Sequence, residues 1–349
     1  MTDAARAGSG DLRPGELVMV RSAGEILATL DAEGALEAMP FMPEMMRFLG
    51  RPFVVSKRAQ KVCDTITYTG SRRLERTVLL EDLRCDGSAH DGCQAECRIY
   101  WKEAWLRRCE PGEPAASAGT PEELRALAAR LAPHVKRSTD GAEETYRCQA
   151  TDLLRCTTRY RLWQPGQYIR ELTSGNVRPA RFLRVMARAV WWETRRKLGR
   201  LPVVHLAGSR QEPAHDEDLA LRPGDWVEVK PREELKEALT PHGRNRGLWF
   251  DWEMERYCGT RQRVRSRVTR FIDDRNGRMV VLKTDAVTLD GVTCTGDYSS
   301  RRWFCPRAVY PYWREAWLKR VAAPAGAEPP EATVPAPAPS PDPAETIAP

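Results

Sequence analysis

The sequence lacks several features that would assign it to a common class. No stretch approaches the ~18–20 consecutive apolar residues of a membrane-spanning helix. The N-terminus, MTDAARAGSG, has no apolar segment of the kind found in secretory signals. Glycine-rich phosphate loops, nucleophile elbows and His-Glu-x-x-His helices are also missing. We therefore expect a cytoplasmic protein with no transmembrane segment, and nothing in the sequence assembles an enzyme.

The chain nevertheless contains ten cysteines. In a reducing compartment, cysteines are more often metal ligands, reactive thiols or buried small side chains than disulfides. Those without paired spacing are expected to be buried small side chains, and metal ligation by Cys148 or Cys156 is kept as an alternative; this set is Cys63, Cys109, Cys148 and Cys156.

Basic residues are in excess, and the net charge is +7. The segment after Val321 contains acidic but no basic residues, so the remainder is more basic than the total suggests. Such a balance favours acidic partners, namely nucleic acid, anionic lipid or an acidic polymer, without choosing among them.

The chain contains an internal repeat at an offset of 209 residues. RPGELVMV at 13–20 reappears as RPGDWVEV at 222–229. After a three-residue insertion in the second copy, YWKEAWL at 100–106 matches YWREAWL at 312–318. So many matches in one register indicate a duplicated unit.

Each copy opens with a Pro-Gly turn followed by an alternating strand pattern. Each closes on Trp-x-x-x-Trp, and tryptophans four apart share one face of a helix. The opening strand resembles those of small SH3-like or KOW-type barrels, and the whole pattern resembles uncharacterised bacterial proteins with two such modules. This resemblance implies an α+β fold, in which two duplicated SH3-like β-barrel modules are joined by a helical middle segment.

The expected layout has seven parts. Composition and the repeat divide the chain into a flexible arm (1–12), a first module with a Cys/His metal loop (13–109), a linker (110–119), a helical middle segment (120–206), a second linker (207–221), a second module (222–321) and a disordered Pro/Ala-rich tail (322–349).

The loop at 85–97, CDGSAHDGCQAEC, is the sharpest local signal. Three thiols and one imidazole are spaced C-x4-H-x2-C-x3-C, and tetrahedral zinc takes four such ligands. Two glycines give the loop the freedom to wrap around an ion. We therefore predict a metal site, with zinc as the expected ion, at Cys85, His90, Cys93 and Cys97.

The same loop partly resembles the CDGSH iron–sulfur motif, whose cluster is held by three Cys and one His. Cys85-Asp86-Gly87-Ser88 and His90 match, with Ala89 as an additional residue. The upstream Cys-x-Cys of that family is absent, and the further thiols lie downstream instead. The resemblance implies an iron–sulfur cluster as the alternative cofactor.

The second module keeps only part of this site. Cys85 corresponds to Cys294 and Cys93 to Cys305, whereas His90 and Cys97 have no counterparts. We expect a degenerate copy without metal, and the alternative is a second site completed by Cys258. Both copies also repeat a glutamate and an arginine, for which we expect one ion pair per module: Glu44 with Arg58, and Glu253 with Arg267.

The segment Arg178–Arg200 predicts a basic helix in which Pro179 occupies the first turn. Its apolar face, which includes Phe182, Leu183, Met186 and Val190, is expected to pack on a barrel. The residues expected to contact an acidic partner are Arg181, Arg184, Arg188, Arg195, Trp191 and Trp192.

Three functions fit these observations. The first is a metal-stabilised binding or scaffold protein that contacts an acidic partner through the basic helix. The second is an iron–sulfur redox or electron-transfer protein, and the third is a metalloenzyme with an open position on the metal. We expect the first, with peripheral attachment to the inner face of an anionic membrane ahead of nucleic acid, because tryptophan and arginine both suit the lipid interface.

Overall fold

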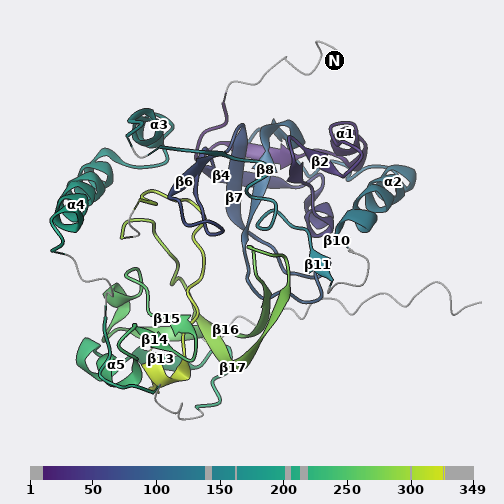
Figure 1. Cartoon of the computed structure of the whole chain (residues 1–349). Coiled ribbons are helices and arrows are strands. Elements are labelled where there is room, and N and C mark those ends of the chain that lie inside the picture. The colour runs from purple at the N-terminus through teal and green to yellow at the C-terminus, as the bar shows by residue number, and fades with distance from the viewer. Residues whose placement is uncertain are drawn as a thin grey trace, which may run out of the picture.

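The computed structural model describes residues 11–137, 144–161, 163–200, 206–212, 219–298, 301–324 and 326. These residues form a mostly antiparallel β-structure with two curled sheets and a few helices (Figure 1). Most of the expected N-terminal arm and C-terminal tail lies outside the described residues, as does part of the second linker.

The first sheet has the strand order β8-β7-β4-β1-β9. Strand β1, next to the edge, pairs antiparallel with both β4 and β9. The bounds are β1 Leu17–Val20, β4 Pro52–Arg58, β7 Thr77–Arg84, β8 Arg98–Lys102 and β9 Leu106–Arg108.

The second sheet has the order β17-β16-β13-β18, with β13 at the position that β1 holds in the first sheet. Val18 lies opposite Phe53 and Arg108, and Val227 lies opposite Gln262 and Arg320, so the pairing register follows the sequence repeat. The bounds are β13 Trp226–Val229, β16 Arg261–Ile272, β17 Met279–Leu289 and β18 Leu318–Arg320.

Short strands and helices complete the described part of the chain. The strands are β2 Ala35–Leu36, β3 Met39–Pro40, β5 Lys61–Cys63, β6 Ser71–Arg73, β10 Lys136–Arg137, β11 Thr145–Tyr146, β12 Thr158–Arg159, β14 Arg244–Asn245 and β15 Leu248–Trp249. The helices are α1 Ala23–Leu27, α2 Pro121–Leu131, α3 Gly166–Thr173, α4 Pro179–Lys197 and α5 Arg232–Ala238. The 3₁₀ helices are η2 Pro43–Phe48, η3 Glu103–Trp105, η4 Ala132–His134, η5 Glu255–Tyr257 and η6 Glu315–Trp317.

The helix expected at Trp-x-x-x-Trp is wrong. Trp101 lies on strand β8 and Trp105 ends η3, and both indoles are fully buried against Phe41 in edge contacts. The chain leaves the strand and turns tightly, so the two side chains return to the same aromatic ring without a continuous helix. Trp313 and Trp317 bury against Phe250 in the same way.

The expected Glu44–Arg58 pair is also wrong. Arg58 is buried and pairs instead with Glu103 of η3 at 3.2 Å. In the second sheet Arg267 pairs with Glu315 of η6 at the same distance. In both sheets the arginine therefore links an interior strand to the 3₁₀ turn that carries the second buried tryptophan. Glu44 is not part of this ion pair and has other partners.

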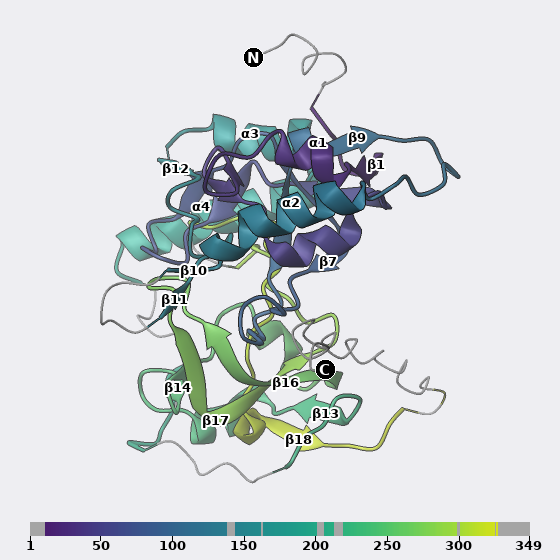
Figure 2. The same cartoon turned by 90° about the vertical axis from the view of Figure 1, so that its right-hand side faces the viewer.

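The two halves of the described structure are in direct contact. The long β16–β17 hairpin reaches from the second sheet towards the first (Figures 1 and 2). Its backbone bonds the first half in two places, since Tyr146 donates to the Gly277 carbonyl at 2.7 Å and Gln94 donates to the Arg270 carbonyl at 3.1 Å. The metal loop at 85–97 is thus in contact with both halves of the described structure.

Candidate metal centre

A cavity of about 40 Å³ lies where the two halves meet. Its wall combines the metal loop, the turn after Arg147 and three residues of the second module. The lining residues are Met42, Cys85, His90, Cys93, Ala95, Glu96, Cys97, Arg98, Tyr100, Cys148, Gln149, Ala150, Ile272, Arg307 and Val309. All four ligands predicted from the sequence therefore face one space, together with a fourth cysteine, Cys148.

The metal loop is closed by its own backbone. The Cys85 N–H donates to the Cys97 carbonyl at 2.8 Å, and the His90 N–H donates to the Gly87 carbonyl at 2.9 Å. Gly87 has φ +70°, and a Cβ there would lie 2.1 Å from the carbonyl oxygen of Cys93. Only glycine permits this close crossing, which brings Cys85 and Cys93 to the same cavity.

Glu44 organises the loop from the 3₁₀ helix η2. Its Oε1 accepts from the Ala89 N–H at 3.2 Å, lies 2.5 Å from His90 Nδ1 and 3.7 Å from Cys85 Sγ. The ligand atoms of Glu44, Cys85 and His90 all lie within 4.8 Å of one another, so this group could hold a metal ion. The sequence-based reasoning had assigned Glu44 to an ion pair and missed this role.

Cys93 and Cys97 line the cavity but stand outside that group. Among the described residues, Glu44, Cys85 and His90 form the one group of three whose ligand atoms lie within 4.8 Å of one another. No three cysteine sulfurs in the described part of the chain lie that close together. Cys93 Sγ instead accepts a hydrogen bond from the Ile272 N–H of β16 at 3.4 Å. Four-ligand binding by Cys85, His90, Cys93 and Cys97 stays a prediction.

Burial dominates the electrostatics of the thiols. It raises the pKa of Cys97 and of Cys148 to about 11, and it also raises the pKa of Cys85 and Cys93. Backbone N–H groups oppose the rise at three of these sulfurs: Gly87 acts on Cys85, Ala95 on Cys93, and Thr151 and Ala150 on Cys148. A metal ion that replaces the thiol protons leaves thiolates, and the same N–H groups would stabilise those thiolates by hydrogen bonds.

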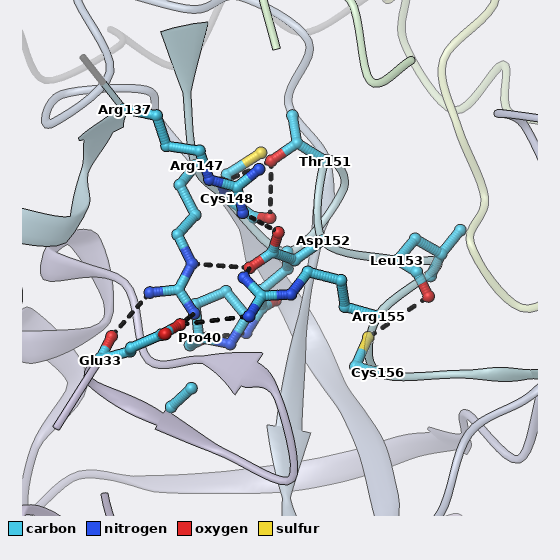
Figure 3. Close-up of polar contacts among 12 residues, drawn as sticks. Glu33, Pro40, Arg137, Arg147, Cys148, Thr151, Asp152, Leu153, Arg155 and Cys156 are labelled. Carbon is cyan, nitrogen blue, oxygen red and sulfur yellow. Dashed lines mark hydrogen bonds and ion pairs between the residues drawn. The ribbon is translucent and has the colours of Figure 1, made fainter. Parts of the chain in front are cut away.

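Cys148 is positioned by a network of charges (Figure 3). The carboxylate of Asp152, which is fully buried, pairs with Arg147 at 2.6 Å and also with Arg137 and Arg155. Thr151 Oγ1 accepts from the Cys148 N–H at 2.9 Å. The adjacent Arg147 carbonyl lies 3.1 Å from His90 Nε2, so the Cys148 turn and the metal loop are linked directly.

The second module repeats the turn but not the ligand set. The N–H groups of Thr295 and Tyr298 donate to Glu253, and Tyr298 matches Ala89 of the first module. Cys305 Sγ accepts from the Cys63 N–H at 3.1 Å. Cys258 follows η5 and lies half-buried near Glu255 and Arg232. Whether Cys294, Cys305 and Cys258 form a second site is an open prediction.

The predicted basic helix is α4, but its faces are arranged differently from the expectation. Arg181 pairs with Asp297 at 2.8 Å, and the Arg188 guanidinium lies 4.1 Å from the Tyr298 ring centre, so both contact the second module. Trp192 packs edge-on against Trp252. Arg184 and Arg195 are exposed, and Arg195 lies over Trp191.

Apolar residues occupy both sides of α4. Val185 and Ala189 are buried, with Phe182 and Met186 packed around Trp303 and Phe304 in the same cluster. Leu183 and Val190, which were expected to be packed, are exposed instead. The exposed large side chains are Leu183 (68%), Val190 (63%), Trp191 (50%) and Leu198 (59%).

No protein-family model, curated protein or solved structure matches this chain. Within the described residues, no helix combines the length and apolar character needed to cross a bilayer.

Proposed function

We propose that this chain is a metal-stabilised binding protein that attaches to an anionic membrane surface through α4. The observation that carries the proposal is the exposed face of that helix. Leu183, Val190 and Leu198 fall within one arc of the helix, and Trp191, Arg184 and Arg195 follow along its edge. A helix lying in the membrane interface has this distribution, with apolar side chains entering the lipid and cations bound to headgroups.

The membrane is preferred to nucleic acid because of the apolar residues. A phosphate backbone would bind Arg184 and Arg195, and Trp191 could stack on a base. Neither contact with nucleic acid would bury the apolar side chains of Leu183, Val190 and Leu198. Entry into lipid would remove these side chains from water. Burial of apolar surface contributes about 25 cal/mol per Å².

The inner face of the same helix is anchored on the turn of the second module that corresponds to the metal loop. Arg181 contacts Asp297 of the turn that Cys294 begins, and Phe182 stacks on Phe304 beside Cys305. We propose that the two sheets are duplicated SH3-like modules and that a metal in the cavity holds them together. The scaffold would then present α4 in a fixed orientation.

Vesicle co-sedimentation tests the proposal. The full chain is spun with vesicles of phosphatidylcholine alone or mixed with phosphatidylglycerol, at low and moderate salt. Binding is expected only to the anionic vesicles and should weaken with salt. Arg184→Glu with Arg195→Glu should weaken it strongly, because each arginine near an anionic surface is worth roughly 1 kcal/mol. Val190→Glu should do the same by removing apolar contact.

A matched control is Val281→Glu on β17, where the native side chain is 66% exposed. It introduces the same charge at an equally exposed apolar site away from α4, and it should leave vesicle binding unchanged. Equal loss with V281E would show that net charge rather than α4 drives binding. Binding to duplex or single-stranded nucleic acid, with none to vesicles, would replace the membrane by nucleic acid as the partner.

A further inference from the structure

We infer that the cavity binds an iron–sulfur cluster whose four ligands are Cys85, Cys93, Cys97 and Cys148. This inference rests on the metal centre of the proposed function and names the cofactor and its ligand set. Four cysteines are the common ligand set of such clusters. In this set Cys148 replaces His90 as the fourth ligand. Cys148 lies outside the 85–97 loop, in the turn after Arg147.

His90 is not free to be a ligand in this arrangement. Its Nδ1 lies 2.5 Å from Glu44, and its Nε2 lies 3.1 Å from the Arg147 carbonyl oxygen. A carbonyl oxygen only accepts, so Nε2 carries a proton and donates it. Both ring nitrogens are therefore engaged within the protein, and the imidazole links the loop to the Cys148 turn.

The sulfur atoms lie too far apart for three of them to hold a single ion. A tetrahedral ion with Zn–S bonds of ~2.3 Å holds its sulfurs about 3.8 Å apart. No three of the cavity's cysteine sulfurs fall within 4.8 Å of one another. The cavity of about 40 Å³ exceeds the ~10–15 Å³ that holds one water, so it is larger than a lone ion requires. A cluster has several iron atoms between its ligands, so it needs sulfurs that are farther apart than those around one ion and a larger volume.

The surrounding charges suit a negatively charged occupant. Arg307 is buried on the cavity wall, bonded to Thr65 Oγ1 at 2.7 Å, and Asp274 is 3.9 Å away. Arg98 lines the same cavity and donates to two neutral oxygens, Ser56 Oγ and the Leu80 carbonyl. A buried guanidinium such as that of Arg307, whose carboxylate partner is 3.9 Å away, is costly. A cluster bound by four thiolates carries net negative charge and would offset that cost.

Hydrogen bonds to the sulfurs also fit. The Ile272 N–H from the second module donates to Cys93 Sγ at 3.4 Å. Such bonds stabilise cluster-bound thiolates and tune their potential. On transfer, each of the four cysteine thiols forms one sulfur–iron bond, while one small-molecule thiolate leaves the same iron and takes up the proton. Iron and inorganic sulfide come from outside the chain as a preformed cluster, so ligation itself oxidises no residue of the protein.

The test is anaerobic purification of the full chain, followed by transfer of a preformed iron–sulfur cluster ligated by small-molecule thiolates. Visible absorption should appear, with several irons and matching acid-labile sulfide per chain, and a paramagnetic signal should follow reduction. Cys148→Ser should lose most of the iron. The control is Cys156→Ser in the same turn, whose Sγ bonds the Leu153 carbonyl and does not line the cavity. It should bind as much iron as the parent.

His90→Gln separates the two ligand sets, because glutamine can still bond the Arg147 carbonyl. Retention of the cluster in H90Q with loss in C148S supports the inference. Loss in H90Q with retention in C148S overturns it. If C148S does not fold, the metal content of the parent chain decides whether the cavity binds a cluster. Colourless protein with one zinc per chain overturns the cluster but leaves the proposed metal-stabilised function, whereas protein that binds no metal overturns both.

Discussion

Asp152 is the residue on which the Cys148 turn depends most. Its carboxylate is inaccessible to solvent and forms ion pairs with Arg147, Arg137 and Arg155. Arg147 in turn donates to the Glu33 carbonyl at 2.7 Å, which connects the turn to the loop after α1 (Figure 3). Because the guanidinium of Arg147 is itself buried, removal of the Asp152 charge leaves the half-exposed carboxylate of Glu33, 3.4 Å away, as its only ion-pair partner among the described residues.

Asp152→Asn should therefore destabilise the protein by about 3–5 kcal/mol, since it keeps the size of the side chain but removes the charge and replaces one acceptor oxygen by a donor that faces the arginines. Urea unfolding measures this change. The control is Glu122→Gln, which breaks an exposed pair with Arg125 and should cost less than about 1 kcal/mol. Equal small effects of the two variants would mean that the buried arginines are already neutralised by other groups.

At the level of elements, the two Cys-x-Gly turns are the closest structural match between the modules. Gly87 and Gly296 have φ values of +70° and +69°, and both face the backbone of the next cysteine, Cys93 or Cys305. A glutamate from an earlier turn holds each loop. The turn thus occurs in both copies of the repeat, and His90 and Cys97 are the candidate ligands that the first copy has in addition.

Gly87→Ala tests the close crossing within the metal loop, with Gly92→Ala as its control. Both glycines have φ near +70°, but a Cβ at Gly92 meets nothing within 4 Å. G92A should cost only the left-handed strain of about 1–2 kcal/mol. G87A adds a clash with the Cys93 backbone, so it should lower the melting temperature further and reduce bound metal. Equal melting temperatures would show that the loop can open at this crossing without cost.

The elements that sequence reasoning could predict are those encoded by neighbouring residues. The repeat located β1 and β13, and the Arg178–Arg200 segment with Pro179 in its first turn located α4. Glu44 acts on His90, 46 positions along the chain, and no local spacing marks such a contact. Cys148 likewise reaches the cavity through tertiary packing. For α4, periodicity identified an amphipathic helix but could not show which neighbour would cover which face.

In the whole molecule, Gln94 joins the metal loop to the second sheet. Strand β16 has a register irregularity between Val268 and Arg270, which takes Thr269 out of the regular pairing. Gln94 Oε1 accepts from the Thr269 N–H at 2.7 Å and from the Arg270 N–H at 3.1 Å. A side chain of the first module therefore satisfies backbone donors of the second, beside the Ile272 N–H that bonds Cys93.

Gln94→Ala should loosen this junction without unfolding either sheet. Amide hydrogen exchange at Thr269 and Arg270 is expected to accelerate about 2- to 10-fold, which corresponds to the ~0.5–1.5 kcal/mol of a single hydrogen bond. Exchange at β13 should stay unchanged, because its partners lie within the second sheet.

The matched control is Gln262→Ala on the same strand, since Gln262 Nε2 bonds only Thr260 Oγ1 within its own module. Q262A should leave the Thr269 and Arg270 amides as they are in the parent chain. If Q94A and Q262A give the same exchange pattern, Gln94 does not couple the halves. If Q94A also lowers bound metal, the contact between the modules supports the cavity as well as the irregular strand, because Ile272 and Cys93 would separate together.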